Sequence, residues 1–214
     1  MSLNEKILSI LTICAIVFLP HLKLIPSFGY FIPILLLVWL CLKNTHENFK
    51  DIGFSIKRFT THAILIGSAV ALLTLAFMQL IFFPVLDYFI PVEASDASIY
   101  DFIRENKWQY LIMVVMGWIV GGFYEEIVFH GFIFTRLELL FKGKYATKLS
   151  FVMTAIIFGV YHYQLGIFDM INALLVGAVY LGLFLYYKRN LWYSIICHGV
   201  YNTIVITLLY LGYF

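Results

Sequence analysis

The sequence predicts an all-α protein, a polytopic membrane helix bundle with about seven transmembrane helices. Hydrophobic residues make up 63% of the 214 residues and charged residues only 12%, whereas a soluble domain carries about 25% charged residues. The mean hydropathy is +0.93, and apolar runs recur from one end of the chain to the other. We therefore expect a single membrane domain over residues 1–214.

The apolar runs predict seven spans, because a membrane helix needs about 20 mostly apolar residues. The second and sixth spans are short, and the length of the fourth allows a break near Gly121–Gly122. We expect the N-terminal spans over 1–86 to support a functional core over about 109–208. The predicted spans cover 7–22, 28–42, 62–86, 109–135, 149–168, 170–187 and 191–213.

The basic residues predict the orientation of these spans. Of the 14 lysines and arginines, Lys23, Arg104 and Lys107 fall on one side of the layout and all the others on the opposite side. Cytoplasmic loops are enriched in Lys and Arg, so we expect a multi-pass protein of the cell membrane with its N-terminus in the cytoplasm and its C-terminus outside. No cleavable signal peptide is apparent, and the first span is expected to stay.

Two predicted cytoplasmic loops carry most of these positive charges. Residues 43–61 combine charged and apolar side chains, so this loop could be an amphipathic segment at the membrane surface. Residues 136–148 predict a basic hairpin that turns at Gly143.

Composition excludes several classes of protein. The net charge of +2 is too small to indicate a nucleic-acid partner. The three cysteines, Cys14, Cys41 and Cys197, all lie in apolar runs. An odd count without clustered spacing argues against a disulfide framework or a zinc finger, so we expect the cysteines to be small apolar packing residues.

A few polar side chains lie deep inside the predicted spans and mark a candidate site. An acid buried in a membrane is costly, so we interpret it as functional. Counted at about 1.5 Å per helical residue, Glu125, His162, His198 and Asn202 lie about 12–20 Å from the cytoplasmic boundary, near mid-membrane. Tyrosines and cysteines aside, the ionisable side chains well inside the spans are Glu125, Glu126, His130, His162 and His198.

The spacing of these residues predicts which of them share a helix face. Residues four apart point the same way, and adjacent residues are rotated by about 100°. One of the two adjacent glutamates can therefore face a cavity while the other braces its own helix. The pairs four apart are Glu126 with His130, Phe158 with His162, and His198 with Asn202.

These ordered motifs resemble the CAAX-protease and bacteriocin-processing family (CPBP, or Abi) of intramembrane glutamic endopeptidases. The family pattern is Glu-Glu-x-x-x-Arg, then Phe-x-x-x-His, then His-x-x-x-Asn on successive membrane helices. The resemblance covers roughly residues 109–208, and His130 stands where the family has Arg. Because His is not always charged and lacks the bidentate geometry of Arg, it is a weaker partner for Glu126. The matching stretches are Glu125–His130, Phe158–His162 and His198–Asn202.

The resemblance implies hydrolysis of a peptide bond near or within the membrane, without a cofactor. It implies catalytic roles for Glu125, Glu126, His162, His198 and Asn202, supported by His130 and Phe158. In this hypothesis Glu125 activates a water that His162 orients, while His198 and Asn202 donate hydrogen bonds to the developing oxyanion. Glu126 and His130 would hold the helix and tune Glu125.

The expected partners are a peptide or membrane-protein substrate and the lipid bilayer, without nucleic acid. A small chain with little soluble mass fits a bacterial protein that matures a peptide or bacteriocin or confers self-immunity. The oligomeric state stays open.

Three other functions remain at this stage. A zinc-dependent protease could use Glu125, His162 and His198 as ligands, leaving one position for water. A non-catalytic membrane regulator or immunity protein is favoured by the departure at His130. A transporter with an acidic relay is disfavoured, because the sequence lacks internal repeats.

Overall fold

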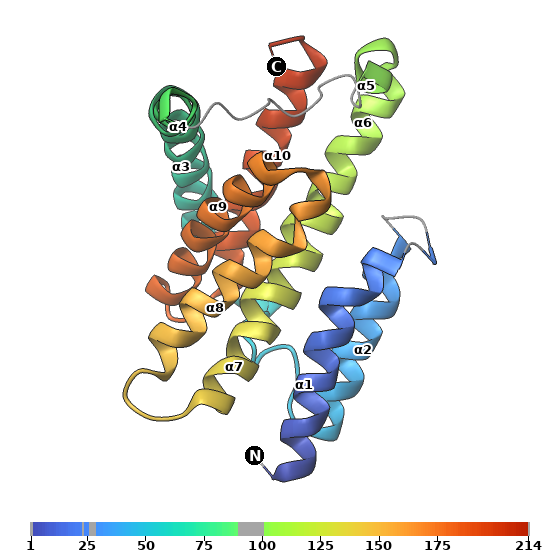
Figure 1. The fold of residues 1–214 in the computed structure, drawn as a ribbon, viewed down its shortest axis with the longest axis vertical. Coiled ribbons are helices and arrows are strands. Elements are labelled where there is room, and N and C mark those ends of the chain that lie inside the picture. Colours follow the sequence, from blue (N-terminus) through green and yellow to red (C-terminus); the bar gives the residue numbers. More distant parts are fainter. Residues whose placement is uncertain (1, 23, 26–28, 90–100, 214) are drawn as a thin grey trace.

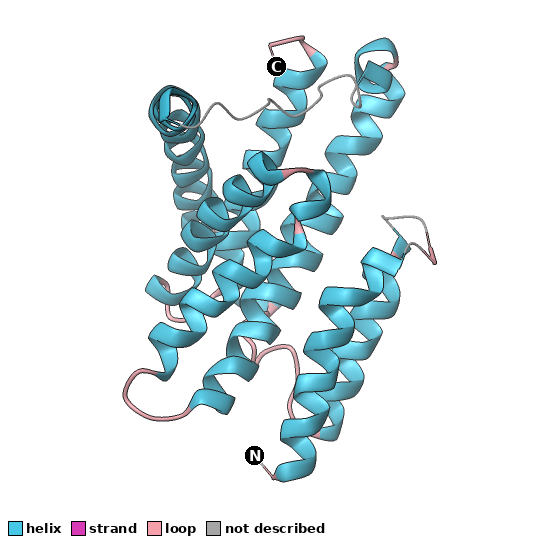
Figure 2. Cartoon of the chain, in the orientation of Figure 1, coloured by secondary structure: helices cyan, strands magenta, loops and turns pink. Residues whose placement is uncertain are grey.

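The chain folds into a bundle of helices, seen in a computed structural model that describes residues 2–22, 24–25, 29–89 and 101–213. Figure 2 shows helices joined by short loops, and no strand occurs among the described residues. The predicted all-α membrane bundle is therefore confirmed, with a helical segment at each of the seven predicted spans. By length and composition, the helical stretches able to cross a membrane are Leu3–Leu22, Thr61–Phe89, Lys107–Phe141, Ile167–Tyr186 and Leu191–Tyr210.

The first two helices form a hairpin beside the rest of the bundle (Figure 1). Helix α1 spans Leu3–Phe18 and continues as η1 over Leu19–Leu22. It begins at a capping box, in which the Ser2 hydroxyl accepts from the Glu5 backbone N–H and the Glu5 carboxylate from that of Ser2, as is typical of helix N-termini. Helix α2 spans Phe31–Asn44, and its contacts with η6 join the hairpin to the bundle.

A long helical stretch follows and packs on the C-terminal helix. It consists of α3 over Thr61–Phe77, the wide-turn segment η4 over Met78–Phe82, and α4 over Phe83–Phe89. A Cβ on Gly67 would lie 2.8 Å from the Ile196 side chain and 3.0 Å from the Tyr193 carbonyl oxygen. The glycine thus permits α3 to approach α10 closely, as small residues commonly do in membrane bundles.

The central helix holds the candidate site and runs through the middle of the bundle in Figure 1. After the short α5 (Asp101–Glu105), it comprises α6 (Lys107–Met116), η6 (Gly117–Ile133) and α7 (Phe134–Phe141). The expected break near Gly121–Gly122 is wrong: the helix continues, but its η6 turns are of the wide π type. Each π-type backbone bond reaches one residue further than in an α-helix, and such turns are frequent at functional sites.

The last three helices surround this central helix. They are α8 (Ala146–Tyr161), α9 (Ile167–Tyr186) and α10 (Leu191–Tyr210). The predicted fifth span of 149–168 is wrong at its end, because α8 stops at Tyr161 and the chain turns through η7 (Tyr163–Leu165). Gly166 ends this turn at φ 115°, a left-handed conformation that favours glycine. His162 therefore lies at a turn between two helices rather than inside one.

The loop over residues 43–61 docks onto the helix ends, and its place at the membrane surface stays a prediction. It consists of turns and one short helix, η3 (Ile56–Arg58), and Ile52 is fully buried. The Arg58 guanidinium donates hydrogen bonds to the carbonyl oxygens of Arg189 at 2.7 Å and Lys188 at 2.8 Å. These bonds attach the loop to the connection between α9 and α10.

Arg136 does not lie in the basic hairpin, where the sequence placed it. It lies in α7, is fully buried, and forms an ion pair with Glu47 and a hydrogen bond of 3.2 Å to the Thr45 hydroxyl. The hairpin itself turns at Gly143, at φ 82°, as predicted. A buried cation needs such a partner, and the loop over residues 43–61 supplies it.

The two ends of the chain lie at opposite ends of the long axis of the bundle (Figure 1). This arrangement is what an odd number of crossings produces. The assignment of either end to the cytoplasm stays a prediction.

Candidate active site

Glu126 is the most enclosed acid in the bundle and joins two helices. Its side chain is fully buried, and its Oε2 lies 2.8 Å from Nδ1 of His130, four residues further along η6. Its other oxygen, Oε1, lies 2.8 Å from Nδ1 of His198 on α10. The predicted contact with His130 is confirmed, whereas the contact with His198 was not anticipated. One carboxylate therefore orients two imidazoles.

Glu125 faces the other way, toward a cavity. Its Oε1 lies 3.9 Å from Nε2 of His162, and its Oε2 lies 3.7 Å from Nε2 of His198. Both distances exceed a direct hydrogen bond, and polar groups at such a separation commonly share a water. Glu125 is thus flanked by two imidazole nitrogens from different elements, with space for a small polar molecule beside them.

Hydrogen bonding fixes the orientation of the His162 ring. Its Nδ1 lies 2.8 Å from the carbonyl oxygen of Phe158, one turn back in α8. A carbonyl oxygen can only accept, so Nδ1 carries the proton and donates it. In the neutral ring Nε2 then has a free lone pair, and this atom is the one nearest Glu125. His162 can accordingly accept a hydrogen bond at the point where a water would sit.

Asn202 lies one turn beyond His198 on α10. Glycines in η6 let this part of α10 touch the central helix. A Cβ on Gly121 would lie 2.3 Å from Asn202 Nδ2 and 3.1 Å from His198 Nε2. Asn202 Nδ2 donates a long hydrogen bond of 3.3 Å to the Gly117 carbonyl oxygen, and its amide has a second N–H to offer. The α10 pair His198 and Asn202 therefore presents two nitrogens at one spot against the backbone of η6.

Aromatic rings pack around these polar groups and hold them in place. Phe158 is buried, and its ring centroid lies 4.7 Å from that of His162 and 5.2 Å from that of His130. Tyr180 on α9 is fully buried and stacks on His198, with centroids 4.5 Å apart and ring planes 20° apart. These contacts restrict both imidazoles to one orientation.

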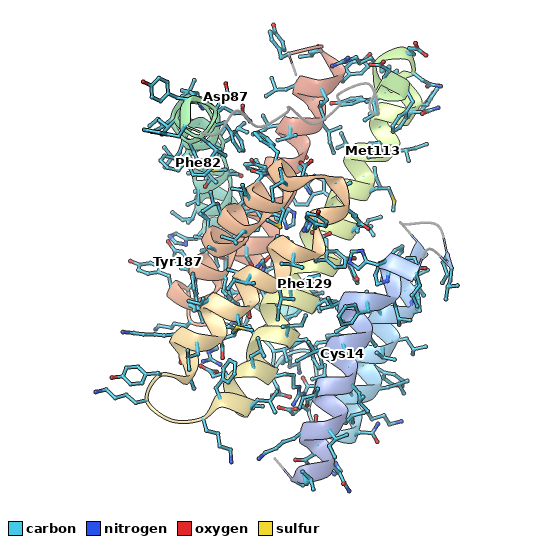
Figure 3. The ribbon with its side chains drawn as sticks, viewed as in Figure 1. Cys14, Phe82, Asp87, Met113, Phe129 and Tyr187 are labelled. Atoms are coloured by element: carbon cyan, nitrogen blue, oxygen red, sulfur yellow. The ribbon has the colours of Figure 1, made fainter. Side chains whose placement is uncertain are left out.

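A cavity of about 250 Å³ adjoins these groups. It is lined by residues of α6, η6, α8, α9 and α10 and of the turn between α8 and α9, and the site residues among them are Glu125, Phe158, His162, His198 and Asn202. Met113 on α6, labelled in Figure 3, lines the same cavity. Because a cavity needs only about 10–15 Å³ to hold one water, there is room for water and for part of a substrate.

The alternative zinc site finds no support in the ligand geometry. Among the described residues, no group of three or more His, Cys, Asp and Glu side chains is arranged to hold a metal ion. In the set of Glu125, His162 and His198, the carboxylate oxygens lie 3.7–3.9 Å from the two ring nitrogens. This arrangement suits a carboxylate and an imidazole acting on a water. The absence of zinc stays a prediction.

Two residues of this site escaped the sequence interpretation. Tyr180 gave no signal, since a tyrosine inside an apolar run is unremarkable as a sequence feature. Asp169, which also lines the cavity, was placed between two predicted spans because the end of α8 was set too late. A turn signal at Gly166 could have moved it to the start of α9 and onto the cavity.

Helices of membrane length bring two acids, three imidazoles and an amide together at one internal place. Residues 107–204 match the family described as type II CAAX prenyl endopeptidase Rce1-like, nearly the stretch for which the motifs predicted it. Through this region the chain is similar to the CPBP or CAAX protease family, which consists of intramembrane proteases. No curated protein and no solved structure matched the chain in the corresponding comparisons.

Proposed function

We propose that this endopeptidase cleaves its peptide substrate with a water activated by Glu125, without a metal. The observation that carries the proposal is the pair of acceptors facing one space, Glu125 Oε1 and His162 Nε2, 3.9 Å apart. A water between them donates one proton to each acceptor. Its oxygen lone pair is then directed at a carbonyl carbon in the cavity, and Glu125 takes the proton as the new bond forms.

The nitrogens of α10 would stabilise the charge that develops on the carbonyl oxygen. Asn202 Nδ2 has a second N–H. The His198 ring, whose Nδ1–H is donated to Glu126, also donates from Nε2 when the ring is the doubly protonated imidazolium. Donors placed where the oxyanion forms commonly contribute a factor of about 10²–10³ to kcat. When the intermediate collapses, Glu125 returns its proton to the leaving amine, and the C–N bond breaks.

Glu126 and His130 act in this proposal through His198 rather than through Glu125. The Glu126 carboxylate accepts the Nδ1–H of His198 and fixes the direction of its ring, as a buried carboxylate does for histidines in other hydrolases. His130 occupies the second oxygen of Glu126 at 2.8 Å. The contact that Arg makes in the family thus has a counterpart here, which weakens the case for a non-catalytic protein.

The test is turnover by purified Glu125→Gln in lipid nanodiscs, with an internally quenched peptide as substrate. Gln keeps the size of the side chain but cannot accept the water proton, so we expect a loss of at least about 100-fold. Asp87→Asn, a change of the same kind outside the cavity, is the control. Turnover at the wild-type rate would remove Glu125 from the base role, and a wild-type protein that cleaves no peptide would favour a regulator or immunity protein.

We also propose that the N-terminus is cytoplasmic and the C-terminus external, and that the physiological substrate is a bacterial peptide undergoing maturation or immunity processing. The first proposal rests on the distribution of Lys and Arg. Reporter fusions at both ends test it, and a cytoplasmic C-terminal reporter would contradict it. The second is tested by mass spectrometry of peptides secreted with and without the active protein.

A further inference from the structure

The cavity that holds the site carries a second acid. Its ionisable side chains other than tyrosine are Glu125, His162, Asp169 and His198. None of the described residues that line it is a lysine or an arginine. The mechanism uses Glu125 and the two histidines but leaves Asp169 without a role. Because Asp169 is half-buried, its carboxylate attracts a cation more strongly than it would on a fully exposed surface.

Asp169 stands at one end of a continuous stripe on α9. The stripe consists of Asp169, Asn172, Val176 and Tyr180, spaced three or four residues apart, and all four line the cavity. At its other end Tyr180 stacks on His198. From Asp169 to Tyr180 the stripe covers twelve residues, or about 16 Å along the helix. An extended peptide covers that length with about five residues.

The surroundings of Asp169 suit a bound ammonium or guanidinium group. Asn172, one turn further along α9, accepts a hydrogen bond of 3.2 Å from the Tyr201 hydroxyl through its Oδ1. An amide oxygen has a second lone pair, so it can accept again. Asp169 is half-buried and close enough to the His162 ring to interact with it electrostatically. Two oxygen acceptors from α9 thus lie on one wall of the cavity.

We infer that Asp169, with Asn172 beside it, forms a subsite for a positively charged side chain of the substrate peptide. The charged residue would lie within about five residues of the scissile bond. This inference rests on the proposed function and deepens it, because it assigns a substrate class, peptides with a lysine or arginine near the cleavage point. A carboxylate in the first turn of α9 also stabilises that helix, so the test must separate binding from folding.

The test compares peptides that differ only in one side chain. Lys, Gln or Glu is placed in turn at the positions two to five residues from the cleaved bond, on either side, in an otherwise uncharged sequence. We expect the wild-type protein to favour Lys over Gln by about tenfold in kcat/KM at the best position, and to disfavour Glu. Asp169→Asn should remove the difference, and Asp169→Lys should make Glu the preferred residue.

A reversed preference cannot arise from helix stability alone, so this readout separates the two roles of Asp169. Asp87→Asn is the matched control, since Asp87 lies on α4, on the other side of the view from Met113 (Figure 3), and does not line the cavity. It should retain the wild-type preference. Equal use of all three peptides by the wild type, or an unchanged preference in Asp169→Asn, would overturn the inference.

A binding measurement keeps this inference separate from the mechanism. Fluorescence anisotropy with labelled peptides is measured on Glu125→Gln and on the double variant Glu125→Gln/Asp169→Asn. We expect the first to bind the Lys peptide about tenfold more tightly than the Gln peptide, and the second to bind both alike. If the wild type cleaves nothing, the proposed function fails, yet these affinities still decide whether Asp169 binds a cation.

Discussion

Substitution of Gly121 by alanine should disable the site while leaving the bundle folded. The new Cβ would lie 2.3 Å from Asn202 Nδ2 and 3.1 Å from His198 Nε2. Ordinary contact begins near 3.4 Å, so the Asn202 amide must move by roughly 1 Å. Misplacement of a reacting group by about 1 Å can cost 10²-fold in rate. We therefore expect kcat to fall by about 100-fold.

Folding should survive, because the displaced atom is the end of a flexible side chain. Alanine is also a better helix former than glycine by roughly 0.5–1 kcal/mol. The matched control is Gly182→Ala on α9, where a Cβ would meet nothing within 4 Å. The assay is turnover of a quenched peptide in nanodiscs, with thermal unfolding followed in parallel. Full activity of Gly121→Ala would refute the close approach of η6 and α10 on which the site depends.

Three further predictions follow from the same contacts. Glu126→Gln should lower kcat by at least about 100-fold with KM little changed, because the orienting partner of His198 is lost; an unchanged kcat would contradict this role. Arg58→Ala should lower the free energy of unfolding by about 1–3 kcal/mol, because two charged hydrogen bonds to backbone carbonyls are lost, whereas exposed Lys57→Ala should have little effect in the same thermal melts. Prolonged treatment with a strong zinc chelator should leave turnover unchanged, and a loss that added zinc restores would support the metalloprotease instead.

The sequence predicted the membrane bundle because apolar runs report directly on burial in lipid. The sequence predicted helix ends and loop positions less well, because these depend on a few residues. The end of α8 was missed because residues 162–168 are apolar enough to continue a span, whereas Gly166 ends the turn at a positive φ. The docking of the loop over 43–61 was missed because Arg58 binds backbone carbonyls more than 100 residues away. Every residue has a backbone carbonyl, so the sequence does not indicate which ones Arg58 binds.

The site shows the same division between local and distant contacts. The pair Glu126 and His130 could be predicted, because side chains four apart on a helix meet. The bond from Glu126 to His198 could not, because helix periodicity says nothing about which neighbouring helix a face meets. The wide turns of η6 were equally invisible, although they decide which side of the helix faces α10. The catalytic roles of Glu125, His162, His198 and Asn202 stay predictions that the mutants above test.

The most direct measurement of the central claim is a single turnover in H₂¹⁸O with enzyme in excess of peptide. If Glu125 activates a water that attacks the carbonyl carbon, the new carboxyl group of the product contains one ¹⁸O atom after the first turnover, and Glu125 stays unlabelled. If Glu125 instead attacks the peptide and water then hydrolyses the resulting anhydride at the Glu125 carbon, the first product carries unlabelled oxygen and ¹⁸O enters the Glu125 side chain. Mass spectrometry of the product and of the peptide containing Glu125 distinguishes these results, and the second would contradict the proposed mechanism.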